Sequence, residues 1–139
     1  MSFRIASLNV NGLRDISKRS KLFHMCDIIV LQETHCKNNQ ESQYWGLQSG
    51  GTSFWNNGTS QSRGVAILIK KGLYINTENV TKDSDGRLIS LTAFLSDDQT
   101  YQLTAVYAPN NGKCRKRFFT DLQHLLLQYS NPINIVGVI

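Results

Sequence analysis

Hydrophobic and polar positions along the first third of the chain predict a strand, a helix and a second strand. The segment Phe3 to Val10 alternates loosely and ends at the turn pair Asn11-Gly12, which is typical of a strand. Apolar residues then recur at helical spacing from Leu13 to Cys26, which predicts a short amphipathic helix. The continuous apolar run Ile28 to Leu31 indicates a strand that is buried on both faces. This order predicts a βαβ-like opening.

Antiparallel strands are predicted for the middle of the chain. The mainly polar stretch from Thr34 to Gly51 predicts a loop, or a short helix between loops. Strands are expected over residues 52–55, 64–69, 75–81, 88–95 and 101–107. The polar tetrad 96–99 lies between the last two of these strands and predicts a hairpin.

A second amphipathic helix and a last apolar strand are predicted near the end of the chain. The helix is marked by Phe118, Leu122, Leu125 and Tyr129 and is closed by Pro132, and the strand runs from Ile133 to Ile139. The whole pattern predicts one mixed α/β (α+β) domain over residues 1–139, with crossover helices near both ends. Because the sequence stops inside an apolar strand, we expect a chain that has been cut short rather than a docked core strand.

Composition narrows the class of protein. The 139 residues suit one domain, and a hydrophobic content of 40 % argues against disorder. The sequence shows no secretory signal and no apolar run long enough to span a bilayer, so we expect an intracellular, non-membrane protein. Cys26, Cys36 and Cys114 are few, odd in number and widely spaced, which fits neither a disulfide scaffold nor a paired zinc site.

The charge is positive and unevenly distributed. Fifteen Lys and Arg against ten Asp and Glu give a net charge of +5. A tight basic cluster is formed by Lys113, Arg115, Lys116 and Arg117. The excess is compatible with a polyanionic partner, although a solvated helix face would carry the same residues.

Four polar residues stand at or just after the ends of predicted strands: Asn9, Glu33, Tyr107 and Asn110. Since strand ends of an open α/β sheet share one edge, these side chains can converge there. Glu33 follows a buried strand and is suited to bind Mg²⁺, which takes oxygen ligands and retains several waters. The asparagines are suited to donate to phosphate oxygens, and Tyr107 offers a hydroxyl. Each residue could instead have a purely structural role, since Asn forms turns, Glu caps helices and Tyr packs on sheets.

Five short segments occur in order and at sensible spacings. They are Ser7-Leu8-Asn9-Val10-Asn11-Gly12-Leu13-Arg14, Leu31-Gln32-Glu33-Thr34-His35, Ser62-Arg63-Gly64-Val65-Ala66-Ile67, Asp85-Gly86-Arg87 and Val106-Tyr107-Ala108-Pro109-Asn110. Together they resemble the endonuclease/exonuclease/phosphatase superfamily. Within it they are most similar to the apurinic-endonuclease-like nucleases of non-LTR (LINE-type) retrotransposons. Leu8 and His35 favour that branch, because repair relatives usually carry Trp and Lys at these places. The resemblance extends from Arg4 to Gly137.

The resemblance implies a fold, a reaction and roles for the site residues. The fold would be the N-terminal part of a DNase I-like sandwich of two packed sheets flanked by helices, and incomplete. Glu33 would bind Mg²⁺, with Mn²⁺ as an alternative ion, and Asn9 would be its companion in the metal site. Tyr107 and Asn110 would contact the scissile phosphate or orient the attacking water. His35 would lie at the surface or behind the ligands.

The implied reaction is hydrolysis of a phosphodiester in double-stranded DNA, which nicks one strand and leaves a 3′-hydroxyl. The resemblance implies a nuclear protein and no obligate protein partner. The alternatives are an apurinic/apyrimidinic repair nuclease or exodeoxyribonuclease III-like enzyme, and a phosphatase of the same superfamily acting on a lipid or nucleotide. A non-catalytic relic that binds DNA weakly is a further alternative.

The last residues depart from the family pattern. The family has a Gly-Asp-aromatic/aliphatic-Asn motif at the end of the next strand and a later Ser-Asp-His-type motif. Here Gly137 matches the glycine, but Val138 stands at the aspartate position, and the later motifs are missing. We therefore expect that this chain alone has no competent nuclease centre.

Overall fold

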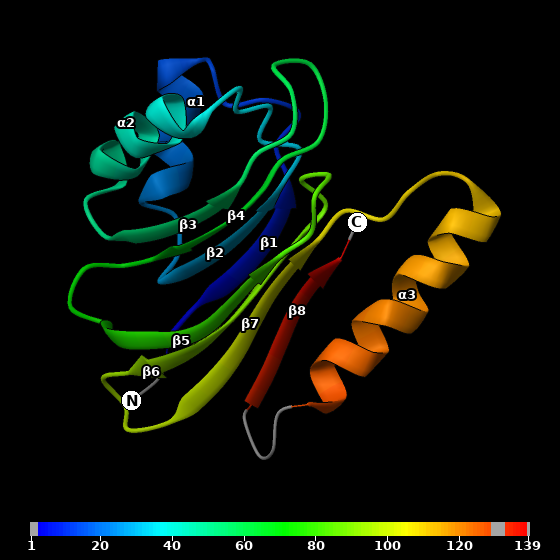
Figure 1. Cartoon of the computed structure of the whole chain (residues 1–139). Coiled ribbons are helices and arrows are strands. Elements are labelled where there is room, and N and C mark those ends of the chain that lie inside the picture. Colours follow the sequence, from blue (N-terminus) through cyan, green and yellow to red (C-terminus); the bar gives the residue numbers. More distant parts are fainter. Residues whose placement is uncertain (1–2, 129–132, 139) are drawn as a thin grey trace.

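Two four-stranded sheets pack against one another, with two helices outside the first sheet and a third helix beside the second (Figure 1). The structure is a computed structural model, and it describes residues 3–128 and 133–138. The first sheet has the order β1-β2-β4-β3, with β1 (Ile5–Asn9), β2 (Ile28–Gln32), β3 (Thr52–Asn56) and β4 (Val65–Ile69). The second has the order β5-β6-β7-β8, with β5 (Tyr74–Lys82), β6 (Leu88–Leu95), β7 (Thr100–Val106) and β8 (Ile133–Val138). The helices are α1 (Ile16–Phe23), α2 (Asn39–Ser49) and α3 (Gly112–Leu127). This arrangement confirms the predicted mixed architecture of two sheets with helices.

The central strand β2 is buried on both faces, as its apolar run predicts. All five of its residues are buried. Ile28 and Val30 face the core between the sheets, whereas Ile29 and Leu31 face the core beneath α1 and α2. Successive side chains of a strand point to opposite faces, so one continuous apolar segment serves both cores. The position of β2 is therefore fixed from two sides.

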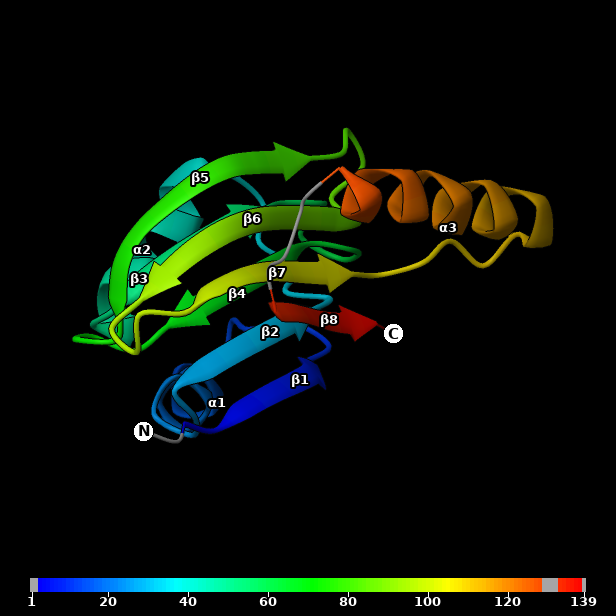
Figure 2. The ribbon, with the colours of Figure 1, turned by 90° about the horizontal axis from the view of Figure 1, so that it is seen from below.

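Two parallel strand pairs place several strand ends at the same end of the molecule. β1 pairs in parallel with β2, and β7 pairs in parallel with β8. Parallel neighbours need a crossover, which is provided by α1 in the first pair and by a connection containing α3 in the second. β1, β2, β7 and β8 all point to one side of the molecule (Figure 2). The predicted crossover helices near both ends of the chain are thus confirmed.

Two helices differ in extent from the prediction. The polar stretch predicted as a loop, or as a short helix between loops, contains the 11-residue helix α2. This helix begins after the N-cap Asn38, whose side chain accepts from the amide of Glu41. Only Ser42 and Trp45 of α2 are buried, so apolar periodicity left little signal of a helix. α3 begins at Gly112, well before its first partly buried apolar residue. The predicted helix markers Tyr129 and Pro132 lie outside the described residues.

Among the described residues, every helix is too short or too polar to traverse a bilayer.

Candidate active site

Asn9 and Glu33 meet at the ends of β1 and β2. The parallel register pairs Asn9 with Gln32, which places Glu33 one residue beyond its neighbour. Asn9 Nδ2 donates to Glu33 Oε2 at 2.7 Å, and Asn9 Oδ1 accepts from the amide of Asn11 at 3.1 Å. Because its oxygen is held by Asn11, Asn9 presents its NH₂ group to the carboxylate. Asn9 therefore orients Glu33, and in this arrangement its oxygen does not lie beside the carboxylate as a second ligand.

The backbone that carries Glu33 adopts an unusual conformation. Glu33 and His35 have φ values of +54° and +56°, in the left-handed region that non-glycine residues seldom occupy. The strain is offset by hydrogen bonds on both sides of the turn. The Gly12 amide donates to the Glu33 carbonyl at 2.7 Å, and the His35 amide donates to the Arg63 carbonyl at 3.1 Å. Strained residues held in this way are concentrated at functional sites.

His35 lies against the carboxylate of Glu33. Its Nε2 atom is 3.6 Å from Glu33 Oε1, and only 12 % of its side chain is exposed. Nε2 is buried without a hydrogen-bond partner among the described residues. Gly12 makes room for the ring, because a Cβ at that position would lie 3.0 Å from His35 Nδ1. Of the two expected positions for His35, the surface and a place behind the carboxylate, the second agrees with its largely buried side chain.

Tyr107 reaches the same carboxylate from the second sheet. It directly follows β7, and its backbone is held by Arg87, whose carbonyl accepts from the Tyr107 amide at 2.8 Å. The Arg87 guanidinium lies 5.5 Å from the centre of the Tyr107 ring. The pKa of Tyr107 is raised by burial, then by the negative charge of Glu33 and a side-chain interaction with it, and Arg87 opposes this effect. Glu33 and Tyr107 are thus close neighbours.

The expectation that the strand ends share the edge of one sheet is wrong. Asn9 and Glu33 belong to the first sheet, whereas Tyr107 belongs to the second. They meet because the two sheets pack with these strand ends at the same end of the molecule (Figure 2). Strand patterns alone did not reveal that the antiparallel hairpin belongs to a separate sheet.

Asn110 takes no part in the hydrogen bonds described around Glu33. It is exposed on the loop between β7 and α3, and its carbonyl accepts from Arg115 Nη1 at 3.4 Å. Among the described residues, no hydrogen bond joins its side chain to Asn9, Glu33 or Tyr107. Its neighbour Asn111 is the N-cap of α3. Any contact of Asn110 with a ligand would therefore be made from the rim of the site.

Strand β8 lies close against β1 and β2 of the first sheet. Gly137 is buried, and a Cβ there would lie 2.5 Å from Ser7 Oγ and 2.6 Å from Val30 Cγ1. Only glycine lets β8 approach the first sheet this closely. The adjacent Gln32 is fully buried, and its Nε2 donates to Ser7 Oγ at 3.1 Å while its Oε1 has no partner among the described residues. The sequence carried a signal for Gln32, because it is a polar residue within a buried strand.

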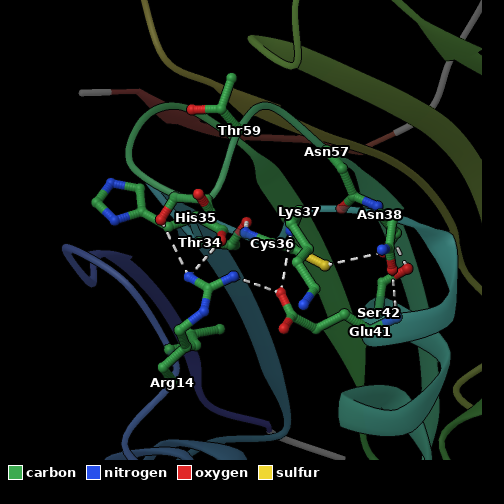
Figure 3. A network of polar contacts seen from close by, with 12 residues as sticks. Arg14, Thr34, His35, Cys36, Lys37, Asn38, Glu41, Ser42, Asn57 and Thr59 are labelled. Carbon is green, nitrogen blue, oxygen red and sulfur yellow. Dashed lines mark hydrogen bonds and ion pairs between the residues drawn. The ribbon is translucent and has the colours of Figure 1, made fainter.

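Arg14 connects the turn that carries Glu33 to two other segments (Figure 3). Its Nη1 donates to the carbonyls of His35 at 2.8 Å and Ser60 at 3.1 Å. Its Nη2 donates to Glu41 Oε1 of α2 at 2.6 Å. One side chain therefore joins the turn after β2, the β3–β4 loop and α2. Sequence reasoning missed this role, because the partners are distant along the chain.

The site offers one carboxylate to a cation. In the described ranges, no three His, Cys, Asp or Glu side chains gather as a metal cluster. Glu33 is 21 % exposed, and its nearest side-chain neighbours include a neutral amide and an imidazole. Mg²⁺ often uses one or two protein carboxylates and retains waters elsewhere. The residues present therefore fit a magnesium ion that is held mainly through Glu33.

Three comparisons place this geometry among known proteins. A sequence model of the Endonuclease/Exonuclease/phosphatase family matches residues 6–134. The chain is 33 % identical over 127 residues to the Transposon TX1 uncharacterized 149 kDa protein of Xenopus laevis, covering 88 % of this chain and 10 % of that protein.

The fold is similar to several solved structures. The AP endonuclease of Archaeoglobus fulgidus aligns with a TM-score of 0.63 and 20 % identity, over 91 % of this chain and 52 % of that chain. The 3′-5′ exonuclease NExo of Neisseria meningitidis aligns at 0.60 and 21 %, over 89 % and 51 %. Truncated TDP2 of Caenorhabditis elegans aligns at 0.60 and 19 %, over 96 % and 60 %. The chain thus spans between half and three fifths of these structures.

Proposed function

We propose a function from one premise: the chain belongs to the endonuclease/exonuclease/phosphatase family. It carries part of the active site of a metal-dependent DNA endonuclease of the retrotransposon type. The similarity to a transposon protein supports the assignment to mobile elements. Because the chain spans only part of its relatives, the nicking of double-stranded DNA is proposed for a complete enzyme that contains this segment.

The proposal depends most on the meeting of Glu33, Asn9 and Tyr107. These residues come from three strands of two sheets, yet the Glu33 carboxylate contacts Asn9 and raises the pKa of Tyr107. A single partly exposed carboxylate beside a phenol and an amide is suited to a phosphodiester, whose oxygens need a cation and hydrogen-bond donors.

Each residue has a distinct proposed role. Glu33 would hold Mg²⁺, or Mn²⁺ in its place, and the ion would neutralise charge on the phosphate and activate the attacking water. Asn9 keeps the carboxylate in position through its NH₂ group. Tyr107, which like any tyrosine is protonated near neutral pH, would donate its hydroxyl to a phosphate oxygen. Asn110 would contact the same backbone from the exposed loop.

We further propose that this chain by itself is catalytically incomplete. The backbone of Val138 pairs with that of Val106, so residue 138 lies at the strand end next to Tyr107. Valine offers no oxygen to bind a metal or to orient water. Removing single preorganised groups typically costs about 2.7–4 kcal/mol of transition-state stabilisation, and groups that act as a unit fail together.

Metal binding tests the role of Glu33 directly. The 139-residue chain is titrated with Mn²⁺, and the free ion is followed by electron paramagnetic resonance. We expect Glu33→Gln to weaken binding at least tenfold, because it removes the negative charge and keeps the shape. Glu78→Gln, on the exposed strand β5, is the matched control and should bind like the parent. Equal binding by the parent and Glu33→Gln would refute the proposed metal site.

Nicking of supercoiled plasmid tests the proposed incompleteness. The purified chain is incubated with plasmid and Mg²⁺, with and without chelator. We expect only background nicking, because Val138 replaces an acidic group. Chelator-sensitive nicking that disappears in Glu33→Ala would contradict the incompleteness while supporting the nuclease function.

A further inference from the structure

Four cationic side chains are concentrated in the first six residues of α3: Lys113, Arg115, Lys116 and Arg117. All four are exposed. None of them takes part in the ion pairs formed within residues 3–128 and 133–138. Arg115 donates to a backbone carbonyl, that of Asn110, at 3.4 Å. Lys113, Lys116 and Arg117, which share one side of the helix and are called here the basic face of α3, therefore carry uncompensated charge toward solvent.

These charges stand where they weaken the helix. The first turn of a helix carries partial positive charge and is stabilised by acidic residues, and the first turn of α3 has none. Lys113 also lies three and four residues before Lys116 and Arg117, a spacing at which like charges repel. Two free amides of the first turn are already satisfied, because the Asn111 side chain accepts from those of Lys113 and Cys114. The cationic side chains thus oppose the stability of α3, which an anionic partner would reverse.

The basic face is turned away from the second sheet. Lys113, Lys116 and Arg117 share one side of the helix by their spacing, roughly opposite the apolar side that contains Leu122. That apolar side packs in a cluster with Val106 of β7. A helix that lies in a membrane surface needs a continuous exposed apolar face beside its cations. On α3 the apolar side around Leu122 is used for packing, and the large apolar side chains that stay exposed are the separate Phe119 and Leu127. The free side is suited to a polyanion rather than to a lipid surface.

α3 follows the candidate active site closely along the chain. A short connection joins Tyr107 to the N-cap Asn111. Figures 1 and 2 show α3 standing to the side of the sheets, with its N-terminal end leading away from them. This end lies on the side toward which β1, β2, β7 and β8 point (Figure 2). A long anion bound at the candidate active site could therefore extend to the basic face of α3.

We propose that the basic face of α3 binds the phosphate backbone of double-stranded DNA to one side of the scissile phosphate. The inference rests on the proposed function, which supplies the DNA substrate. Lysine and arginine side chains bind phosphates through charge and contribute no sequence preference in doing so. The face therefore supplies affinity and salt dependence, whereas the Glu33 site supplies the chemistry.

Charge neutralisation on α3 tests the proposal. Binding of a fluorescein-labelled DNA duplex is measured by anisotropy at several salt concentrations, with chelator present. The variant Lys113→Gln/Lys116→Gln/Arg117→Gln keeps residues of good helix propensity. We expect at least a tenfold loss of affinity at low salt. The slope of log K against log[salt] should fall by about 2–3, since each phosphate contact contributes roughly 0.9.

A second variant removes the same charge elsewhere. Lys21→Gln/Lys70→Gln/Lys71→Gln alters exposed lysines at the end of α1 and after β4, and it leaves the basic face of α3 intact. We expect less than a threefold loss and an unchanged slope. Equal losses in both variants would overturn the proposal, because net charge alone would then explain binding. Circular dichroism must show that both variants retain the helix content of the parent.

Two further outcomes separate this proposal from the others. A chain that binds no DNA at low salt would refute the α3 proposal, whereas the Mn²⁺ titration judges Glu33 independently. Binding to phosphatidylserine vesicles that is tighter than binding to the duplex, and lost in the α3 variant, would overturn the assignment to DNA.

Discussion

The contact between Glu33 and Tyr107 shows how single residues acquire chemical properties from their surroundings. Neither residue type is unusual at a strand end. Burial and the nearby carboxylate together raise the pKa of the phenol, and Asn9 holds the carboxylate through a single hydrogen bond. The turn after β2 adds strain that local hydrogen bonds offset. At this scale, function depends on orientation more than on residue identity.

The pKa of Tyr107 provides a prediction at the residue scale. Glu33→Gln should lower this pKa, because it removes the negative charge that disfavours the phenolate. The pKa should remain above that of a free tyrosine, about 10, because burial persists. Ultraviolet titration of the phenolate gives the value, with Tyr107→Phe as the variant that identifies its signal among the five tyrosines.

The same shift links Tyr107 to stability at high pH. A pKa raised by folding stabilises the folded protein fully below the pKa of the unfolded tyrosine, about 10. That contribution is lost as the pH rises through the folded pKa. The difference in unfolding free energy between the parent and Tyr107→Phe should therefore change only in this alkaline range. A difference that varies instead between pH 5 and pH 8 would contradict this origin.

At the scale of elements, helix boundaries are set by capping groups as much as by apolar periodicity. α2 contains two buried residues, Ser42 and Trp45, and begins at the cap Asn38. α3 begins at the cap Asn111, whose side chain accepts from the amides of Lys113 and Cys114. The apolar pattern placed the middle of α3 correctly but missed its first turns, which project beyond the packed face.

Removal of the α3 cap gives a prediction at the element scale. Asn111→Ala should destabilise the protein by about 1 kcal/mol, because two amides of the first turn lose their acceptor. Urea denaturation followed by circular dichroism measures the change. Asn110→Ala is the matched control, since this neighbouring residue is exposed and is not the cap. Equal destabilisation by the two variants would show that the loop, not the cap, is responsible.

At the scale of the whole molecule, the site exists only because two sheets pack together. Their shared core includes residues of β2, β4, β6 and β7. Gly137 allows β8 to lie against Ser7 and Val30 of the first sheet. This close approach brings the end of the second sheet, with Tyr107, toward Glu33. Sheet packing and site geometry are therefore coupled.

Gly137→Ala tests this coupling. The added Cβ would lie within 2.6 Å of side-chain atoms of Ser7 and Val30, so these side chains or the strands that carry them must shift. Overpacking of this kind typically costs about 1–3 kcal/mol. Denaturant unfolding should show this loss, whereas Val136→Ala, at an exposed position of the same strand, should cost less. A neutral Gly137→Ala variant would mean that β8 is free to move.

The sequence by itself determined the local features of this protein. Periodicity identified most strands, the two-sided burial of β2 and the apolar side of α3, because each reflects the environment of neighbouring residues along the chain. It also placed Glu33 at a strand end, where a carboxylate is held firmly. Only the tertiary structure decided that Tyr107 approaches from a second sheet, that His35 lies against Glu33 and that Arg14 joins three segments. The burial pattern of a segment predicts that its surface is covered, but it does not predict which distant segment covers it. The contacts of Tyr107, His35 and Arg14 depend on which segments pack together.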